Sequence, residues 1–217
     1  MDLIDVVRSR RSIRKFKPEK ISREVICSLL GLARWAPSAH NTQPWCLVAV
    51  DDVEVKARLA KEMGEIWVSD LAMDGVERIK AEEMVRSKNW NRITNSPVII
   101  MVCLDKKAMR KHVDARRRRV EYLTAVQSVA AYVQTFLLLA HNHGFGACWA
   151  CTPLFCQDRV RRVLGLPLSL EAQAMIIMGF PDEKPSPSSR KPMEGICAFN
   201  SWSTRAIGAN SPLASSS

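Results

Sequence analysis

Three arginines and a serine near the amino terminus are suited to binding an anion. Arg10, Arg11, Ser12 and Arg14 follow one another closely at the end of a helix-like run. Guanidinium groups donate paired hydrogen bonds that match a phosphate or a polarised carbonyl edge. The cluster therefore predicts an anion site, and a solvated basic surface is the alternative that remains open.

A short polar turn is the second candidate. The stretch "APSAHNTQPW" places hydroxyl, imidazole and amide groups between two prolines, at residues 36–45. Such groups on a rigid turn suit the edge of a planar heteroaromatic ligand, which presents donors and acceptors in one plane. Turns also use Pro, Ser and Asn for backbone reasons, so a structural turn is the alternative.

The stretch "HNHGFGACWACTPLFC" has the composition of a zinc or redox site. Its candidate ligands are His141, His143, Cys148, Cys151 and Cys156. The histidines end a long helix-like run, however, and the first cysteines lie in a strand-like one. We therefore predict no metal, and expect Gly144 and Gly146 to supply a helix cap and a tight turn into the strand.

Charge and composition limit the classes of partner. Lys and Arg number 32 against 22 Asp and Glu, a net charge of +10 over 217 residues, which favours anionic partners. The run 116–119, "RRRR", has no nucleic-acid motif beside it, so we expect a solvated face and no nucleic acid. Polar residues interrupt the apolar run 123–140, which predicts a buried helix and no membrane span. Seven scattered cysteines and an amino terminus without an apolar signal-like run indicate the cytoplasm.

The hydrophobic pattern predicts one α+β domain with a small sheet wrapped by helices. Helix-like segments lie near 2–9, 22–35, 53–64, 67–88, 115–142 and 156–165. Strand-like runs lie at 45–50, 97–104, 147–151 and 173–180. From about residue 181 four prolines predict an extended arm, and 203–217 read as a disordered tail outside the 1–202 domain.

Six motifs, taken in order, resemble the FMN-dependent nitroreductase family. They are "RRSIRKF", "APSAHNTQPW", "LLLAHNHGFGACW", "VLGLP", "IIMGFP" and "SSRKP". The resemblance covers about residues 3–202. It implies a nitroreductase-like fold, a small mixed or antiparallel sheet wrapped by helices, in an intertwined homodimer with two FMN sites at the interface. It also implies an FMN-dependent oxidoreductase.

The resemblance assigns cofactor-binding roles but no catalytic side chain, because flavin N5 carries the chemistry. The residues are Arg10, Arg11 and Ser12 at the phosphate and ribityl end, Arg14 beside flavin N1 and O2, and Arg190 on the phosphate. Pro37, Ser38 and Ala39 would lie against the ring, with Asn41 and Gln43 bracing that loop. Residues 149–152, which include Trp149 and Cys151, would place backbone N–H groups near flavin N5 and O4. In the family the Pro-Ser turn comes from the other subunit. A cation at Arg14 would stabilise the negative charge of the reduced ring.

A narrower resemblance concerns the acceptor. Three stretches are similar to the nitroreductase-like domain attached to the glutamyl ligase of coenzyme F-420 biosynthesis. They are "EIWVSDLAMDGVERI", "ITNSPVIIMVCL" and "GACWACTPLFCQDRVRRVLGLP". It implies reduction of a dehydro precursor of that deazaflavin coenzyme, an anionic small molecule. The wider family resemblance implies NAD(P)H as the donor. A generic NAD(P)H nitroreductase or quinone reductase is the alternative. A flavin-binding storage or sensor protein and a zinc-containing nucleic-acid-binding protein are the remote ones.

Overall fold

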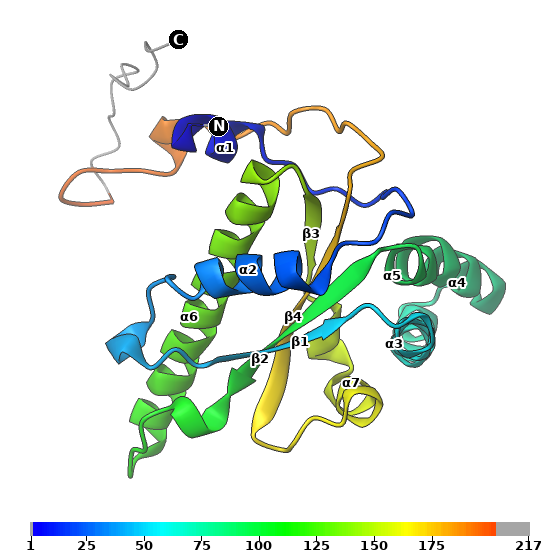
Figure 1. Cartoon of the computed structure of the whole chain (residues 1–217). Coiled ribbons are helices and arrows are strands. Elements are labelled where there is room, and N and C mark those ends of the chain that lie inside the picture. The colour runs from blue at the N-terminus through cyan, green and yellow to red at the C-terminus, as the bar shows by residue number, and fades with distance from the viewer. Residues whose placement is uncertain (1, 203–217) are drawn as a thin grey trace. The chain divides into compact units, whose positions relative to one another are not determined.

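A computed structural model describes residues 2–202 of the chain (Figure 1). Its contacts separate a first unit, which ends at Pro185, from a second that begins at Ser186. The helices of the first unit are α1 (Leu3–Ser9), α2 (Arg23–Ala33), α3 (Val53–Met73), α4 (Arg78–Val85), α5 (Asn91–Thr94), α6 (Ala115–Asn142) and α7 (Gln157–Leu164). The strands are β1 (Trp45–Val50), β2 (Val98–Asp105), β3 (Gly146–Ala150) and β4 (Leu170–Gly179).

The described strands form one antiparallel sheet in the order β1-β2-β4-β3. Side chains of β2 alternate between its two faces. Ile100 and Val102 pack in a cluster with α6 and α2, whereas Ile99 and Met101 pack with α3 and α7. The α+β prediction is therefore confirmed, with β1 and β3 as the edge strands.

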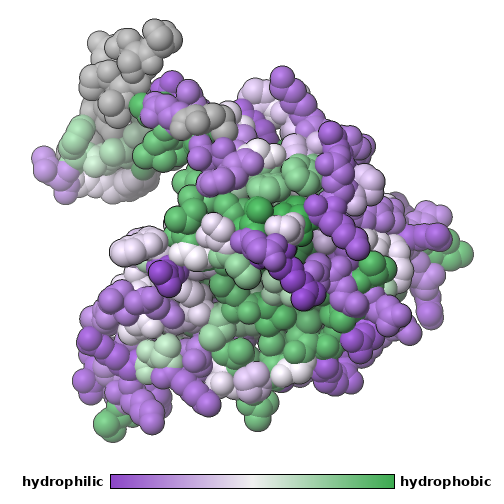
Figure 2. Space-filling model, in the orientation of Figure 1, coloured by the Kyte–Doolittle hydropathy of each residue, from purple (hydrophilic) through white to green (hydrophobic). Residues whose placement is uncertain are grey.

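Helix α6 is central to the first of these clusters. Its Tyr132 and Phe136 are fully buried, and the Tyr132 hydroxyl donates to the carbonyl of Leu30 at 2.9 Å. By length and composition α6 could also cross a membrane, a property that core helices of globular proteins share. Figure 2 shows apolar side chains gathered across the middle of the same view, over β1 and alongside α2.

The helix boundaries predicted around residues 64–67 were wrong. Helix α3 continues through Gly64 to Met73, and α4 begins only at Arg78. A Cβ at Gly64 would lie 2.9 Å from Val85 Cγ1, so this glycine allows α4 to approach α3 instead of ending the helix. The side-chain amide of Asn89 donates to the Ala60 carbonyl at 2.9 Å and fixes the same contact.

The two glycines before β3 have different roles. Gly144 has a φ of 82° and turns the chain after α6, as predicted. Gly146 lies inside β3 and makes no turn, which corrects the prediction. A Cβ there would lie 2.7–2.9 Å from side-chain atoms of Ile13, so the position needs glycine for close packing.

The second unit is described over residues 186–202 and contains one short 3-10 turn, Met193–Gly195. Within this unit Arg190 Nη1 donates to the Ser188 and Ser189 carbonyls at 3.3 and 3.0 Å. The predicted tail at 203–217 lies outside the described residues. The arm expected from 181 begins within the first unit, because Pro181 forms a β-bridge with Phe16.

Candidate functional site

The arginine-rich segment is held along the edge of the sheet. Ser12 forms a parallel bridge with Ala147 of β3, and the backbone N–H of Ile13 donates to the Ala147 carbonyl at 3.0 Å. Further on, the N–H of Lys17 donates to the Phe180 carbonyl at 2.9 Å. The segment is therefore fixed between the edge of β3 and the chain that leaves β4.

Two buried donors beside β3 have no acceptor among the described residues. Arg11 donates through Nη1 to the carbonyls of Arg8 and Arg10 at 2.7 and 2.9 Å, but its Nε is buried without a partner. The indole Nε1 of Trp149 is likewise buried without a hydrogen-bond partner. A buried donor left unpaired costs about 1–3 kcal/mol. Both atoms therefore fit a ligand rich in oxygen and nitrogen acceptors.

Positive charge gathers at the carboxyl end of α6. Ser9 Oγ is hydrogen-bonded to His141 Nε2 at 2.8 Å, so α1 is fastened to this end of the helix. Burial lowers the pKa of His141, and the guanidinium groups of Arg10 and Arg11 lower it further. The histidine therefore stays neutral at pH 7, and the local field favours an anion.

Arg14 lies on a basic cleft of about 490 Å³. Arg14 and Lys15 line it together with Arg92, and the Glu183 carboxylate accepts the backbone N–H of Lys15 at 3.1 Å. Burial raises the pKa of the neighbouring Cys148 thiol, while Arg14 and Arg92 oppose that shift. The cleft can hold one anionic group more readily than a neutral one.

The polar turn predicted as a ligand-facing loop is strained and internally bonded. His40, Asn41 and Gln43 have φ values of 55°, 53° and 46°, which non-glycine residues rarely adopt. The backbone N–H of Gln43 donates to Ser38 Oγ at 3.0 Å, and its side-chain amide donates to Asn41 Oδ1 at 3.2 Å. Strain of this kind persists where the surroundings fix it, often at functional sites.

The turn is anchored on the middle of α6. The backbone N–H of Ala39 donates to Ser128 Oγ at 3.0 Å. Ser128 and His141 are thirteen residues apart, so the turn and Ser9, which directly precedes the arginine segment, contact α6 at points separated by about 20 Å. Figure 1 shows α1 at one end of α6 and the turn beside another part of it. One chain therefore does not bring the two predicted clusters together.

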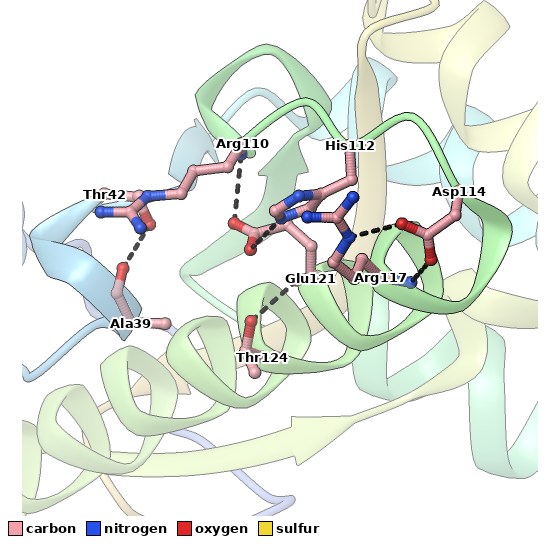
Figure 3. A network of polar contacts seen from close by, with 8 residues as sticks. All are labelled: Ala39, Thr42, Arg110, His112, Asp114, Arg117, Glu121 and Thr124. Atoms are coloured by element: carbon pink, nitrogen blue, oxygen red, sulfur yellow. Dashed lines mark hydrogen bonds and ion pairs between the residues drawn. The ribbon is translucent and has the colours of Figure 1, made fainter.

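A further basic side chain points toward the turn and was missed from the sequence (Figure 3). In Figure 3 Arg110 extends toward Thr42, whose Oγ1 donates to the Ala39 carbonyl at 2.9 Å. The Arg110 backbone N–H donates to Glu121 Oε1 at 3.1 Å, and His112 Nε2 lies 3.6 Å from Glu121 Oε2. The buried Glu121 carboxylate thus positions the loop that carries Arg110. Nothing in the run "KKAMRKH" distinguishes Arg110 from its neighbours.

The zinc-like cluster is dispersed. His141 faces Ser9, and His143 Nδ1 lies 2.8 Å from the Leu139 carbonyl. Cys148 and Cys156 are buried, whereas Cys151 is exposed. Across residues 2–202 no group of three or more His, Cys, Asp or Glu side chains is placed to hold a metal.

The basic run 116–119 forms the exposed first turn of α6. The Asp114 side chain caps this helix, because its Oδ1 accepts the Arg117 N–H at 2.9 Å and its Oδ2 pairs with Arg117 Nε. Arg190, the remaining predicted residue, belongs to the second unit, where its Nη1 donates to the Ser189 carbonyl at 3.0 Å.

A second cleft, of about 450 Å³, opens beside Cys151 and was also missed. Its lining residues are Met63, Ile66, Trp67, Asp70, Asp74, Cys151, Thr152, Phe155 and Cys156. It contains two carboxylates and no basic side chain. On the sequence these residues belong to two stretches about eighty positions apart, so their meeting gives no local signal.

The chain matches known proteins over nearly its whole length. The model of the nitroreductase family matches residues 7–180. A Bacillus subtilis protein named as an NAD(P)H nitroreductase is 28% identical over 194 residues, which cover 88% of this chain and 90% of that protein. A BluB-like flavoprotein from Clostridium difficile superimposes with a TM-score of 0.76 at 27% identity, covering 92% of this chain and 99% of that one. A protein of Desulfovibrio desulfuricans described as a nitroreductase, in complex with FMN, gives 0.68 at 26% identity, covering 91% and 95%.

Proposed function

This chain belongs to the nitroreductase family, and from that premise we propose that it is an FMN-dependent oxidoreductase that uses NAD(P)H to reduce a small conjugated acceptor. One observation carries the proposal above the others. Arg11 Nε and Trp149 Nε1 are buried donors without acceptors, at the edge of the sheet where the resemblance places the cofactor. Flavin mononucleotide offers phosphate, ribityl and ring acceptors for such donors.

The arginine segment would hold the phosphate and ribityl end, through Arg10, Arg11 and Ser12, with Arg190 as a further phosphate ligand from the arm. Trp149 and Cys151 would face the ring near N5 and O4, and Arg14 would stabilise charge at N1 and O2. When bound, FMN supplies the redox chemistry, because its N5 accepts a hydride from one partner and gives it to the next. The protein's own contribution is to bind, to orient and to exclude water.

We propose that a second copy of the chain completes each site. The turn with Pro37, Ser38 and Ala39 lies about 20 Å along α6 from the arginine segment of its own chain, so it would cover the flavin of a partner. Exposed apolar side chains support such an interface: Trp35 after α2 is 79% exposed and Leu123 of α6 is 49% exposed. Obligate dimers bury surfaces of this type.

The partners follow from the same arrangement. The basic cleft at Arg14, Lys15 and Arg92 supports an anionic group such as a phosphate of NAD(P)H. A dehydro precursor of the deazaflavin coenzyme stays the narrower proposal for the acceptor, because it too is anionic, and nitroaromatics or quinones are the alternative. All seven cysteines are free, which supports a reducing compartment such as the cytoplasm.

The proposal is tested by purifying the full chain and recording its visible spectrum with and without added FMN. We expect a flavin spectrum that NAD(P)H bleaches and an acceptor restores. Arg11→Gln should weaken FMN binding about tenfold or more, because hydrogen bonds to a charged donor are lost. Arg116→Gln removes an equal charge at an exposed position and should bind FMN like the wild type. A protein that takes up no FMN would refute the proposal.

The acceptor is identified by comparing the dehydro deazaflavin precursor with a nitroaromatic and a quinone at equal concentration. Faster re-oxidation by the precursor supports the narrower proposal, and faster re-oxidation by the others supports the generic reductase. Bound FMN that no donor reduces would instead indicate a storage or sensor protein.

A further inference from the structure

The cleft beside Cys151 is lined on one side by the last turns of α3. Trp67, Asp70 and Asp74 are spaced so that they share one face of this helix, and all line the cleft. The opposite side is formed by the chain after β3, with Phe155 and Cys156. The site therefore combines two carboxylates, two aromatic rings and a cysteine-containing loop.

The two carboxylates are placed at an electrostatic cost. Like charges four residues apart on a helix destabilise it by about 0.2–0.5 kcal/mol. Asp74 is also the C-cap residue of α3, where the helix dipole already carries negative charge, and the last turn has no basic residue. The sequence thus maintains three sources of negative potential at one point of a protein with a net charge of +10.

Neither Asp70 nor Asp74 forms an ion pair with a cation among residues 2–202. Neighbouring acids are paired, since Glu62 lies 2.8 Å from Arg159 and Glu82 lies 2.9 Å from Arg78. By contrast, no hydrogen bond or ion pair is found for the Asp70 side chain within residues 2–202, and it faces the buried Cys156 thiol. Burial raises the pKa of that thiol to about 11, and the Asp70 carboxylate adds to the shift. The thiol is therefore neutral and does not compete for a cation.

Two aromatic rings, those of Trp67 and Phe155, also line the cleft. Phe155 is 74% exposed and Trp67 is half-buried on the facing helix, so both rings offer accessible surface to a bound molecule. Aromatic faces attract organic cations by about 0.5–2 kcal/mol. A cleft of about 450 Å³ is also within the range of small-molecule sites and far larger than a metal ion requires.

We propose that this cleft binds an organic cation, a protonated amine or quaternary ammonium on an aromatic or apolar body, between Trp67 and Phe155 with its charge at Asp70 and Asp74. Because Cys151 lines the same cleft, the bound cation is an electron acceptor of the reaction, as an alternative to the anionic deazaflavin precursor, and this second part rests on the proposed function. This cleft would therefore select cations, although the net charge of +10 favours anions for the protein as a whole.

The binding part is tested by isothermal titration of the full chain as purified, with three probes of similar size. Benzyltrimethylammonium carries the cation, benzenesulfonate the anion, and benzyl alcohol no charge. We expect the cation to bind at least tenfold more tightly than the other two. Asp70→Asn should weaken its binding about tenfold, and the double variant with Asp74→Asn should weaken it further. Glu54→Gln, an equal charge change at an exposed position of α3 outside the cleft, should leave binding unchanged.

Three outcomes would overturn the inference. They are equal binding of all three probes, preference for the sulfonate, and equal loss in Asp70→Asn and Glu54→Gln. Thermal melting of each variant checks that the near-isosteric changes leave the fold intact.

The acceptor part is tested by turnover with nitrobenzyl compounds that carry an ammonium, a carboxylate or an alcohol. We expect kcat/KM to be at least tenfold higher for the ammonium, and Asp70→Asn to remove that advantage while sparing the alcohol. Cation binding without any flavin turnover would refute the proposed function and leave the cation site standing. Turnover of the alcohol without preference for the ammonium would refute the cation site and leave the proposed function standing.

Discussion

Gly146→Ala is expected to displace the arginine segment from the sheet. The added Cβ would lie 2.7 Å from Ile13 Cγ2, 2.8 Å from its Cβ and 2.9 Å from its Cγ1, closer than real contacts allow. Overpacking of this kind costs about 1–3 kcal/mol. Loss of the hydrogen bond from Ile13 to Ala147 adds about 1 kcal/mol. At about 2–4 °C per kcal/mol for a chain of this size, the melting temperature should fall by about 4–16 °C.

Thermal denaturation and FMN titration of the same samples measure the effect. FMN affinity should fall as well, because Arg11 and Ser12 move with Ile13. The added change Ile13→Ala removes two of the three close atoms and should recover part of the melting temperature. Gly31→Ala is the matched control, because a Cβ added at this position of α2 would meet no packed neighbour within 4 Å. This change should be neutral or slightly stabilising. A Gly146→Ala protein with wild-type melting and FMN binding would refute the packing argument.

Further changes probe the turn, the histidine and the thiols. Ser128→Ala removes the acceptor of the Ala39 N–H, at a cost of about 1 kcal/mol, and should speed exchange of that amide; unchanged protection would contradict it. The folded protein lowers the pKa of His141 below 6.5, so the unfolded chain binds a proton there more readily than the folded chain does. The free energy of unfolding should therefore fall as the pH drops below 6.5. Melting temperatures measured between about pH 5 and 7 should show this slope, and the slope should be weaker in His141→Gln. At about pH 8, alkylation followed by mass spectrometry should modify exposed Cys151 well before Cys156, whose pKa burial raises.

Local pattern was sufficient for much of the fold. The bounds of β1 agree with the predicted run at 45–50, because its apolar residues end at clear turn signals. Ser22 is of a residue type that favours helix N-caps, and its Oγ accepts the Val25 N–H at 3.4 Å at the start of α2. Gly64 misled the helix prediction, since a glycine that admits a neighbouring helix looks the same in sequence as one that ends a helix.

The candidate site was predictable only where its chemistry is concentrated in one stretch. The arginine segment has that property, as does the polar turn. The acidic cleft does not, because Asp70 on α3 resembles any solvated helix position until the fold brings Phe155 opposite to it. Arg110 was missed for a similar reason, since its placement depends on the buried Glu121 of another element.

The arginine segment and the polar turn are both anchored near α6, so in the proposed pair of chains each α6 would connect the two cofactor sites. Each α6 would touch one cofactor through the arginine segment near His141 and the other through the turn at Ser128. Coupling between two such points requires a rigid element with two arrangements, and α6 would be the element that both sites contact, at its carboxyl end and at its middle. Filling the first site should therefore change the affinity of the second, and FMN titration of the apoprotein should show cooperativity that Ser128→Ala abolishes.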